Sequence, residues 1–269
     1  MPAIEAAAAA RAAACLAAGV REAGALALSM FGAPLKHWTK GASSPVSEAD
    51  IAVDQLLRER LSGAGSDIGW LSEESADDPA RLQSRLVWIV DPIDGTRGYI
   101  AGLPDWTISA ALVEDGRPIA ACLFAPVTDE FFAAVAGQGA TCNGQPIAVA
   151  PGAELANMRI AGPKNFLDRV AAITPAFTIV PRVHSLALRL ARVAQGTIDT
   201  AIAGGNSHDW DLAAADLLVH EAGGALTRFD GTPLNYNRAL PRHGMLVAAG
   251  HHRHAALLEV LRDPRLAVQ

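Results

Sequence analysis

The chain has 269 residues, of which 51% are hydrophobic and 19% are charged, and its formal net charge is −6. This length and composition suit a globular protein with one large core or two lobes. The acidic balance and the absence of a long basic run argue against a duplex nucleic-acid partner, for which a basic stripe is typical. The cysteines Cys15, Cys122 and Cys142 lack a metal-type spacing and favour a reducing, cytoplasmic location.

Two helices are predicted in the first quarter of the chain. Segment 2–30 is rich in alanine, but Arg11 interrupts it, so an amphipathic helix is favoured over a signal peptide. No apolar stretch is expected to reach the roughly 20 residues that span a bilayer, and no membrane partner is predicted. Segment 48–62 follows as a second helix, with Ser47 as its N-cap and Asp50 in its first turn.

Apolar, β-rich segments come next and indicate an antiparallel sheet. The turn residues Glu114-Asp115-Gly116 are typical of a hairpin between two of these segments. A turn-rich stretch ending at Asn143-Gly144 closes this half of the chain. The predicted strands are 86–90, 106–114, 118–126 and 130–136.

After about residue 150, short strands alternate with helices. This change of pattern predicts a layered α/β sandwich with two lobes, 1–150 and 151–269. The histidine-rich run 251–254 is interpreted as a solvated turn beside the last helix rather than as a metal site. The predicted strands are 157–161, 177–180, 225–229 and 244–249, and the predicted helices are 183–195, 210–222 and 253–262.

The sequence DPIDGT at 91–96 is the most informative stretch of the chain. It places Asp91 at the end of the predicted strand 86–90 and Asp94 three residues later, with proline and glycine favouring a turn. Both carboxylates and the Ile93 carbonyl can then face one point, and such hard oxygen ligands suit Mg²⁺, Mn²⁺ or Ca²⁺. An ordinary Asx-type turn is the alternative interpretation.

Further carboxylates stand at the ends of predicted elements, as Asp91 does. Glu73 follows a short apolar segment, and Asp211 opens the predicted helix 210–222, as Asp50 opens an earlier one. Helix capping explains the last two equally well. Convergence of Glu73, Asp91, Asp94 and Asp211 would require two or three Mg²⁺ ions to offset the repulsion. A phosphate ester would then be the natural substrate, attacked by a metal-activated water.

These motifs, in this order, resemble the inositol monophosphatase superfamily of Mg²⁺-dependent, Li⁺-sensitive phosphatases. The resemblance extends from Lys40 to Gly250 and rests on four stretches, which are PVSEAD (45–50), SEES (72–75), DPIDGT (91–96) and WDLAAA (210–215) leading to EAGG (221–224). It implies an α/β (α+β) fold, a layered αβαβα sandwich, and a homodimer. It also implies that Mn²⁺ substitutes for Mg²⁺ and that Li⁺ and Ca²⁺ inhibit.

The resemblance implies a set of metal ligands. Glu73, Asp91 and the Ile93 carbonyl correspond to ligands of the first ion. Asp91, Asp94 and Asp211 correspond to ligands of the second. A third, weaker ion would depend on Glu73 through water, which gives this residue a catalytic role as well.

It also implies roles in catalysis and substrate binding. Thr96 and Asp50 correspond to the pair that orients and deprotonates the attacking water. The amides of Gly95 and Thr96 correspond to a phosphate cradle. Ser185 and Asp211 are further expected contacts of the substrate.

Three positions favour one subgroup, the bacterial 3'(2'),5'-bisphosphate nucleotidases (CysQ-type). Arg97 follows the central motif where that subgroup carries lysine, and Arg189 stands where inositol-type enzymes carry an acid. Gly204 replaces a glutamate of the inositol type. Two added cations suit a second phosphate on the substrate. Arg97 as a solvated surface charge and Arg189 in an ion pair are the alternatives, and Gly98 departs from the nucleotidase pattern.

The sequence therefore predicts a small phosphorylated metabolite as substrate. The leading expectation is hydrolysis of 3'-phosphoadenosine 5'-phosphate to AMP and phosphate, a reaction of sulfur metabolism. Inositol 1-phosphate, a sugar phosphate or histidinol phosphate are alternatives within the superfamily. A role as a partner of the transcription machinery is an alternative of another class.

Overall fold

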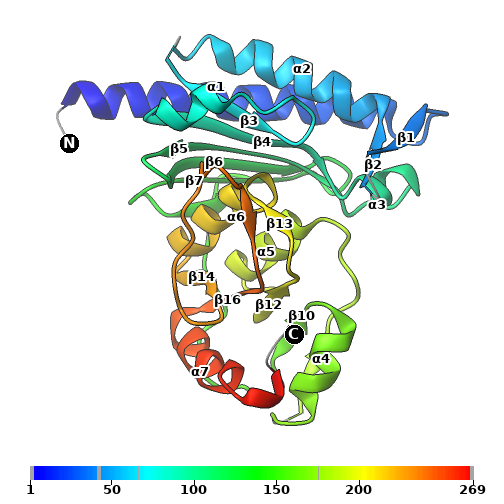
Figure 1. Ribbon diagram of the computed structural model, residues 1–269, viewed down its shortest axis with the longest axis vertical. Helices are drawn as coiled ribbons and strands as arrows, with labels where there is room; N and C mark the ends of the chain where they lie inside the picture. Colours follow the sequence, from blue (N-terminus) through cyan, green and yellow to red (C-terminus); the bar gives the residue numbers. More distant parts are fainter. Residues whose placement is uncertain (1–2, 41–43, 66, 175, 267–269) are drawn as a thin grey trace.

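The computed structural model describes residues 3–40, 44–65, 67–174 and 176–266 (Figure 1). Its helices are α1 (Ala3–Met30), α2 (Glu48–Ser62), α3 (Thr96–Ile100), α4 (Lys164–Ala171), α5 (Leu186–Ala194), α6 (Asp209–Glu221) and α7 (His251–Leu261), with short 3-10 helices η1 (Pro79–Gln83) and η2 (Pro264–Leu266).

The strands form two large sheets and two short ribbons. The seven-stranded sheet contains β3 (Gly69–Ser72), β4 (Leu86–Asp94), β5 (Thr107–Glu114), β6 (Arg117–Ala125), β7 (Glu130–Val135), β8 (Ala140–Cys142) and β9 (Gln145–Ile147), in that order. The five-stranded sheet has the order β11 (Thr178–Ile179), β10 (Arg159–Ala161), β12 (Thr200–Ala203), β16 (Leu246–Gly250), β14 (Gly224–Arg228). The ribbons pair β1 (His37–Lys40) with β2 (Ser44–Ser47), and β13 (Ser207–His208) with β15 (Arg242–His243).

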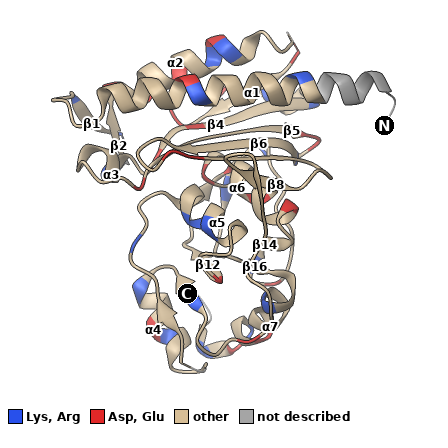
Figure 2. Ribbon diagram, turned by 180° about the vertical axis from the view of Figure 1, so that it is seen from behind, with Lys and Arg blue, Asp and Glu red and all other residues tan. Residues whose placement is uncertain are grey.

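Helices and sheets alternate in layers, as the views from the two sides show (Figures 1 and 2), which confirms the αβαβα sandwich. Helices α1 and α2 cover the outer face of the seven-stranded sheet, and α5 and α6 lie between the two sheets. Helices α4 and α7 pack on the far side of the five-stranded sheet. One core cluster joins both sheets through α5 and α6, so the middle layer fixes one half of the chain against the other. The predicted lobe boundary near residue 150 falls between β9 and β10 and stays a prediction.

The predicted strands and helices are confirmed to within a few residues at their ends, and residue 2 lies outside the described part. The long antiparallel strands β4 to β7 follow the predicted hairpin pattern. The shorter elements β1, β2, β3, β8, β9, β12, β13, β15, α3 and α4 were not predicted, because segments of this length carry too few residues to display a period.

Strand β4 differs from the prediction at the functionally important end. The prediction that the strand stops at Val90 is wrong, because β4 continues to Asp94. Asp91 pairs with Ser109, the register then shifts, and Asp94 pairs with Thr107. Pro92 has no N–H for the ladder, and a bulge accommodates such a residue. The turn follows only at Gly95, whose φ of 96° lies in the left-handed region.

The histidine-rich run is also placed differently from the prediction. Residues 251–254 form the first turn of α7 rather than a solvated turn. Arg253 and His254 are buried, and His254 Nε2 lies 2.9 Å from the Thr227 hydroxyl. The run therefore anchors α7 on the sheet.

Helix α1 corrects the expectation that no apolar stretch reaches membrane-spanning length. Its segment Ala10–Met30 is long and apolar enough, by length and composition, to cross a membrane. In the structure Leu16, Val20 and Ala23 are fully buried, and the helix packs on α2 and the seven-stranded sheet. Its apolar side chains therefore contribute to the protein core.

Candidate metal and phosphate site

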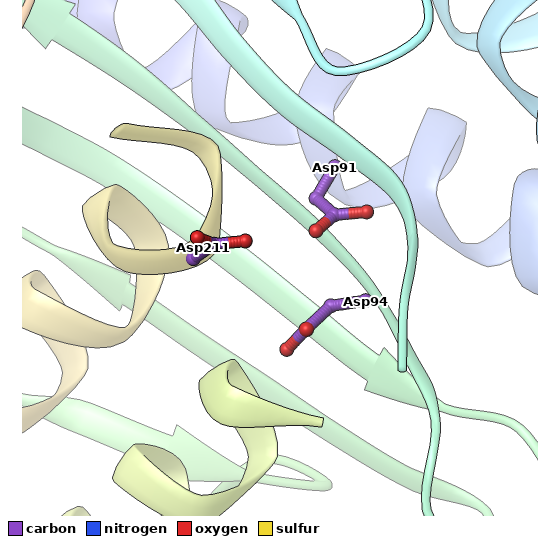
Figure 3. A group of neighbouring side chains, drawn as sticks. All are labelled: Asp91, Asp94 and Asp211. Carbon is purple, nitrogen blue, oxygen red and sulfur yellow. The ribbon is translucent and has the colours of Figure 1, made fainter. Parts of the chain in front are cut away.

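Three carboxylates from distant parts of the chain converge beside the seven-stranded sheet (Figure 3). Asp91 and Asp94 project from the end of β4, and Asp211 from the first turn of α6. One oxygen of each carboxylate lies within 4.8 Å of the others. The middle layer thus brings a helix of the C-terminal half to the strand that carries the DPIDGT motif.

The carboxylates line a cavity of about 330 Å³ that contains most of the predicted site. The predicted residues that line it are Glu73, Asp91, Ile93, Asp94, Gly95, Thr96, Arg97 and Asp211. Sequence reasoning did not assign a role to three other lining residues, Pro45, Arg182 and His184. His184 immediately precedes the α5 N-cap Ser185, and Arg182 lies three residues before it; this proximity to a predicted site residue is the only local signal for them.

Burial and mutual repulsion raise the pKa values of these carboxyl groups. Burial, then the charges of Asp211 and Glu74, raise the pKa of Glu73 to about 8. Burial and Asp211 likewise raise the pKa of Asp94 to about 7, against the lowering effect of the Ser185 hydrogen bond. The pKa of Asp91 lies well above its usual value because of burial, then Glu73. A bound cation would relieve both causes.

The donor set fits a hard divalent cation. Asp91 is 1% exposed, and its Oδ1 is buried and accepts no hydrogen bond within the described part of the chain. A buried carboxylate oxygen without a donor costs free energy unless a cation approaches it. Asp91, Asp94, Asp211 and Glu73 would hold such ions through oxygen atoms, which Mg²⁺, Mn²⁺ and Ca²⁺ prefer.

Asp50 lies outside the cavity lining but reaches it through Thr96. Asp50 Oδ2 accepts hydrogen bonds from the Ser47 amide, at 2.8 Å, and from the Ser47 hydroxyl, at 2.6 Å. Asp50 Oδ1 lies 3.1 Å from the Thr96 hydroxyl. Asp50 therefore caps α2 and also faces the DPIDGT turn, and its role with the attacking water stays a prediction. Burial raises the pKa of Asp50.

The Thr96 hydroxyl, which is predicted to pass a proton to Asp50, lies within hydrogen-bond distance of two oxygen atoms. It lies between Asp50 Oδ1 and the Ile93 carbonyl oxygen, at 3.1 Å and 3.0 Å. We expect Thr96→Ala to lower kcat by about 100-fold, the lower part of the range for a general-base pathway. Steady-state phosphate release checks this, and Thr96→Ser, which keeps the hydroxyl, should retain most of the rate. Equal losses in both variants would contradict a role for the hydroxyl.

Ser185 is placed behind Asp94 rather than on the cavity surface. It is fully buried, and its hydroxyl donates to Asp94 Oδ2 at 2.6 Å. The Ala187 amide donates to the same oxygen at 2.6 Å. These bonds fix the Asp94 side chain against the N-terminus of α5. The contact of Ser185 with a substrate stays a prediction.

Arg189 lies in a neighbouring cavity of about 580 Å³ rather than in the carboxylate cavity. Its Nη1 donates to the Ile202 carbonyl at 3.3 Å. Among the described residues it forms no ion pair within 4.0 Å, but burial lowers the pKa of its guanidinium and the charge of Asp94 acts on it in the opposite direction. Arg97 is exposed and lines the carboxylate cavity. Arg182 lines both cavities, so the two adjoin.

The model of the inositol monophosphatase family matches residues 9–264. The chain belongs to the inositol monophosphatase family. It is 33% identical to an inositol-1-monophosphatase of Rhizobium meliloti over 84% of this chain and 85% of the relative. It is also 33% identical to a histidinol-phosphatase of Mycobacterium tuberculosis over 85% of this chain and 89% of the relative. The crystal structure of the extragenic suppressor protein SuhB from Bartonella henselae is 29% identical, covers 93% of this chain and 98% of its own, and has a TM-score of 0.82.

Membership of this family establishes the reaction class. The protein is a phosphatase, a phosphoric monoester hydrolase. Its acidic cluster is the counterpart of a divalent-metal centre, because several buried carboxylates that face one another require cations to stay ionised.

Proposed function

We propose that this phosphatase acts on a small ester with a second phosphate, and that its substrate is 3'-phosphoadenosine 5'-phosphate, which it converts to AMP and phosphate. The observation that carries the proposal is the basic cavity next to the carboxylate cavity. Lys164, Arg182 and Arg189 line it. A substrate could place one phosphate at the carboxylates and a second phosphate against these cations.

The shape and charge of the second cavity support this assignment. Arg189 is half-buried, and burial lowers the pKa of its guanidinium, which therefore gains from an anionic partner. Arginine can hold two phosphate oxygens at once. Gly204 lines the same cavity and contributes no carboxylate to it, whereas the resemblance to the inositol type would imply a glutamate at this position. Apolar residues, among them Ile179, Val180 and Val183, line the remainder and could contact a base.

Each residue of the proposed site has a separate role in the hydrolysis. Mg²⁺ held by the carboxylates would supply Lewis-acid polarisation of the phosphoryl oxygens and a water of lowered pKa. Thr96 would orient the attacking water and relay its proton to Asp50, whose Oδ1 lies 3.1 Å from the Thr96 hydroxyl. The amides of Gly95 and Thr96 hold the phosphate oxygens at the start of α3. The bond between phosphorus and the 3' oxygen would break as the bond between phosphorus and the water oxygen forms, and the 3' oxygen would take up a proton from solvent water to give AMP.

A panel of substrates tests the proposal. Phosphate release should be measured with Mg²⁺ for 3'-phosphoadenosine 5'-phosphate, inositol 1-phosphate and histidinol phosphate. The expected result is the highest kcat/KM for the nucleotide. A higher kcat/KM for either of the other two would overturn the nucleotide assignment and leave the phosphatase class intact.

Arg189→Ala should weaken binding of the doubly phosphorylated substrate more than that of a monophosphate. A hydrogen bond to a charged group contributes about 1.5–3 kcal/mol, which corresponds to an increase in KM of about 10- to 100-fold. Arg192→Ala is the matched control, because Arg192 lies on the same helix but pairs with Glu130. A similar change of KM in both variants, or for both classes of substrate, would count against a phosphate contact at Arg189.

Inositol 1-phosphate is the second candidate, because the Rhizobium relative bears the name of an inositol-1-monophosphatase. The same substrate panel decides between the two.

We also propose Mg²⁺ as the resident ion, a homodimer, and a cytoplasmic location. The cytoplasmic location is supported by the three cysteines, which are free. A role as a partner of the transcription machinery predicts that the cellular function survives in the variant Asp94→Asn. This substitution removes a predicted metal ligand and is expected to abolish phosphatase activity.

A further inference from the structure

The segment between β14 and β16 crosses from one sheet to the other. It is drawn in orange in Figure 1, where it rises from the five-stranded sheet to the seven-stranded one. We call its residues 232–243 the strap. The Tyr236 amide donates to the Gly116 carbonyl at 3.1 Å, and Arg117 Nη1 donates to the Leu234 carbonyl at 3.0 Å. Leu234 and Tyr236 are buried, so the strap is firmly attached to the β5–β6 turn.

A buried arginine connects the strap to the segment that carries Glu73. Arg81 is 2% exposed and lies in η1, eight residues after Glu73. Its Nε and Nη2 donate to the two carboxylate oxygens of Asp77, at 2.5 Å and 2.8 Å. Its Nη1 donates to Asn237 Oδ1 at 2.7 Å, and Asn237 Nδ2 donates to the Arg81 carbonyl at 3.0 Å. The segment that follows Glu73 and the strap therefore meet at one guanidinium.

The strap is joined in turn to the start of α6. The Asn237 amide donates to Asp209 Oδ2 at 2.8 Å. His243 Nε2 lies 2.7 Å from Asp209 Oδ1, so both carboxylate oxygens have a partner in the strap. Asp209 is 1% exposed and is the first residue of α6, two positions before Asp211. Because a helix is rigid over one turn, a shift of Asp209 moves Asp211 as well.

We propose that the hydrogen-bond chain Arg81–Asn237–Asp209 is a positioning network that sets the metal affinity of the site. It links the segment of Glu73 to the helix of Asp211, and these two residues face the cavity from opposite halves of the chain. The carboxylates at the cavity repel one another, so they would move apart without such a restraint. Residues that hold metal ligands from behind typically change metal affinity by about 10- to 100-fold.

Asn237→Gly is the most selective test. It removes both side-chain bonds to Arg81 and keeps the amide that binds Asp209, and glycine tolerates the φ of 57° found at Asn237. The Kd of Mn²⁺ for the metal-free protein should be measured by electron paramagnetic resonance. We expect it to rise by about 10-fold, with a parallel rise in the Mg²⁺ concentration needed for half-maximal phosphate release. At saturating Mg²⁺, kcat should return to within about twofold of the wild-type value, because no catalytic group is lost.

Two further variants separate positioning from general stability. Arg81→Lys should also raise the Kd of Mn²⁺, because an ammonium group cannot bind Asp77 and Asn237 with the same geometry as the guanidinium. Arg253→Lys is the matched control, since Arg253 is equally buried but donates to the Ala150, Pro151 and Glu154 carbonyls far from the cavity. It should lower Tm and leave the Kd of Mn²⁺ unchanged.

Two results would overturn the proposal. One is wild-type Mn²⁺ affinity in folded Asn237→Gly and Arg81→Lys. The other is an equal loss of affinity in Arg253→Lys, which would indicate an effect of stability alone. The Mn²⁺ measurement contains no substrate, so its outcome does not depend on which phosphate ester the enzyme hydrolyses.

Discussion

Replacing Asp91 with asparagine is expected to abolish phosphate release. Asp91 is a predicted ligand of two ions, and its Oδ1 is buried without a hydrogen-bond donor in the described part of the chain. Metal polarisation of a phosphoryl group contributes several kcal/mol to transition-state stabilisation, so kcat/KM should fall by about 1,000-fold or more. Steady-state assays with Mg²⁺ check this. Asp199→Asn is the control, because Asp199 is a buried carboxylate paired with Arg159 outside the cavity.

The same substitution should make the metal-free protein more stable. Asp91→Asn removes a carboxyl group that is ionised in the unfolded chain at neutral pH but whose ionised form the metal-free fold disfavours, because burial and the neighbouring carboxylates raise its pKa. In the presence of a chelator, the Tm of the variant should therefore be higher than that of the wild type. The increase in Tm on addition of Mg²⁺ should be smaller in the variant. A lower Tm in chelator would show that these carboxylates do not oppose folding. Such opposition of stability and activity is common where charges are assembled for catalysis.

The stability of the metal-free protein should fall as pH rises from about 4 to about 8. In the unfolded chain Asp94 and Glu73 lose their protons near 3.8 and 4.5, whereas in the folded protein they keep them to about 7 and about 8. The folded state therefore binds more protons than the unfolded state throughout this interval, so each increase in pH favours unfolding. The free energy of unfolding of the metal-free protein should therefore decrease steadily between these two pH values.

Urea denaturation of the metal-free protein across this pH range measures the effect. Saturating Mg²⁺ should flatten the dependence, because a bound cation stabilises the ionised carboxylates that the metal-free fold disfavours. The stabilisation by Mg²⁺ should consequently be larger at pH 8 than at pH 5. A metal-free stability that rises over this range would contradict the raised pKa values of Glu73 and Asp94.

The sequence identified the part of the site that is local in the chain. The DPIDGT stretch places Asp91, Ile93 and Asp94 within four residues of one another, so their proximity is guaranteed by the covalent chain. Ser47 and Asp50 are likewise recognisable, because a capping box is a local pattern, and the structure contains it. The long antiparallel strands were predictable for a related reason, since eight or nine residues show a clear period and hairpin turns have specific residues.

Interactions between distant segments were beyond the reach of these local patterns. The bulge that carries β4 on to Asp94 depends on pairing with Thr107 of another strand. The position of Arg189 in a second cavity, and of Arg182 between the two, depends on how α5 packs under the sheet. The network around Arg81 joins residues separated by 156 positions, and nothing near Arg81 in the sequence indicates its partner.

The amino-acid sequence by itself determined the chemistry of this protein, because its acidic motifs are short and each is formed by neighbouring residues. It also determined the layered fold, through the periods of its longer helices and strands. Only the tertiary structure decided that Asp211 meets Asp91 and Asp94, that Ser185 supports Asp94 from behind, and that a basic cavity adjoins the carboxylates. These contacts arise when the middle helices pack between the two sheets, since burial of their apolar faces brings together residues that the chain keeps far apart.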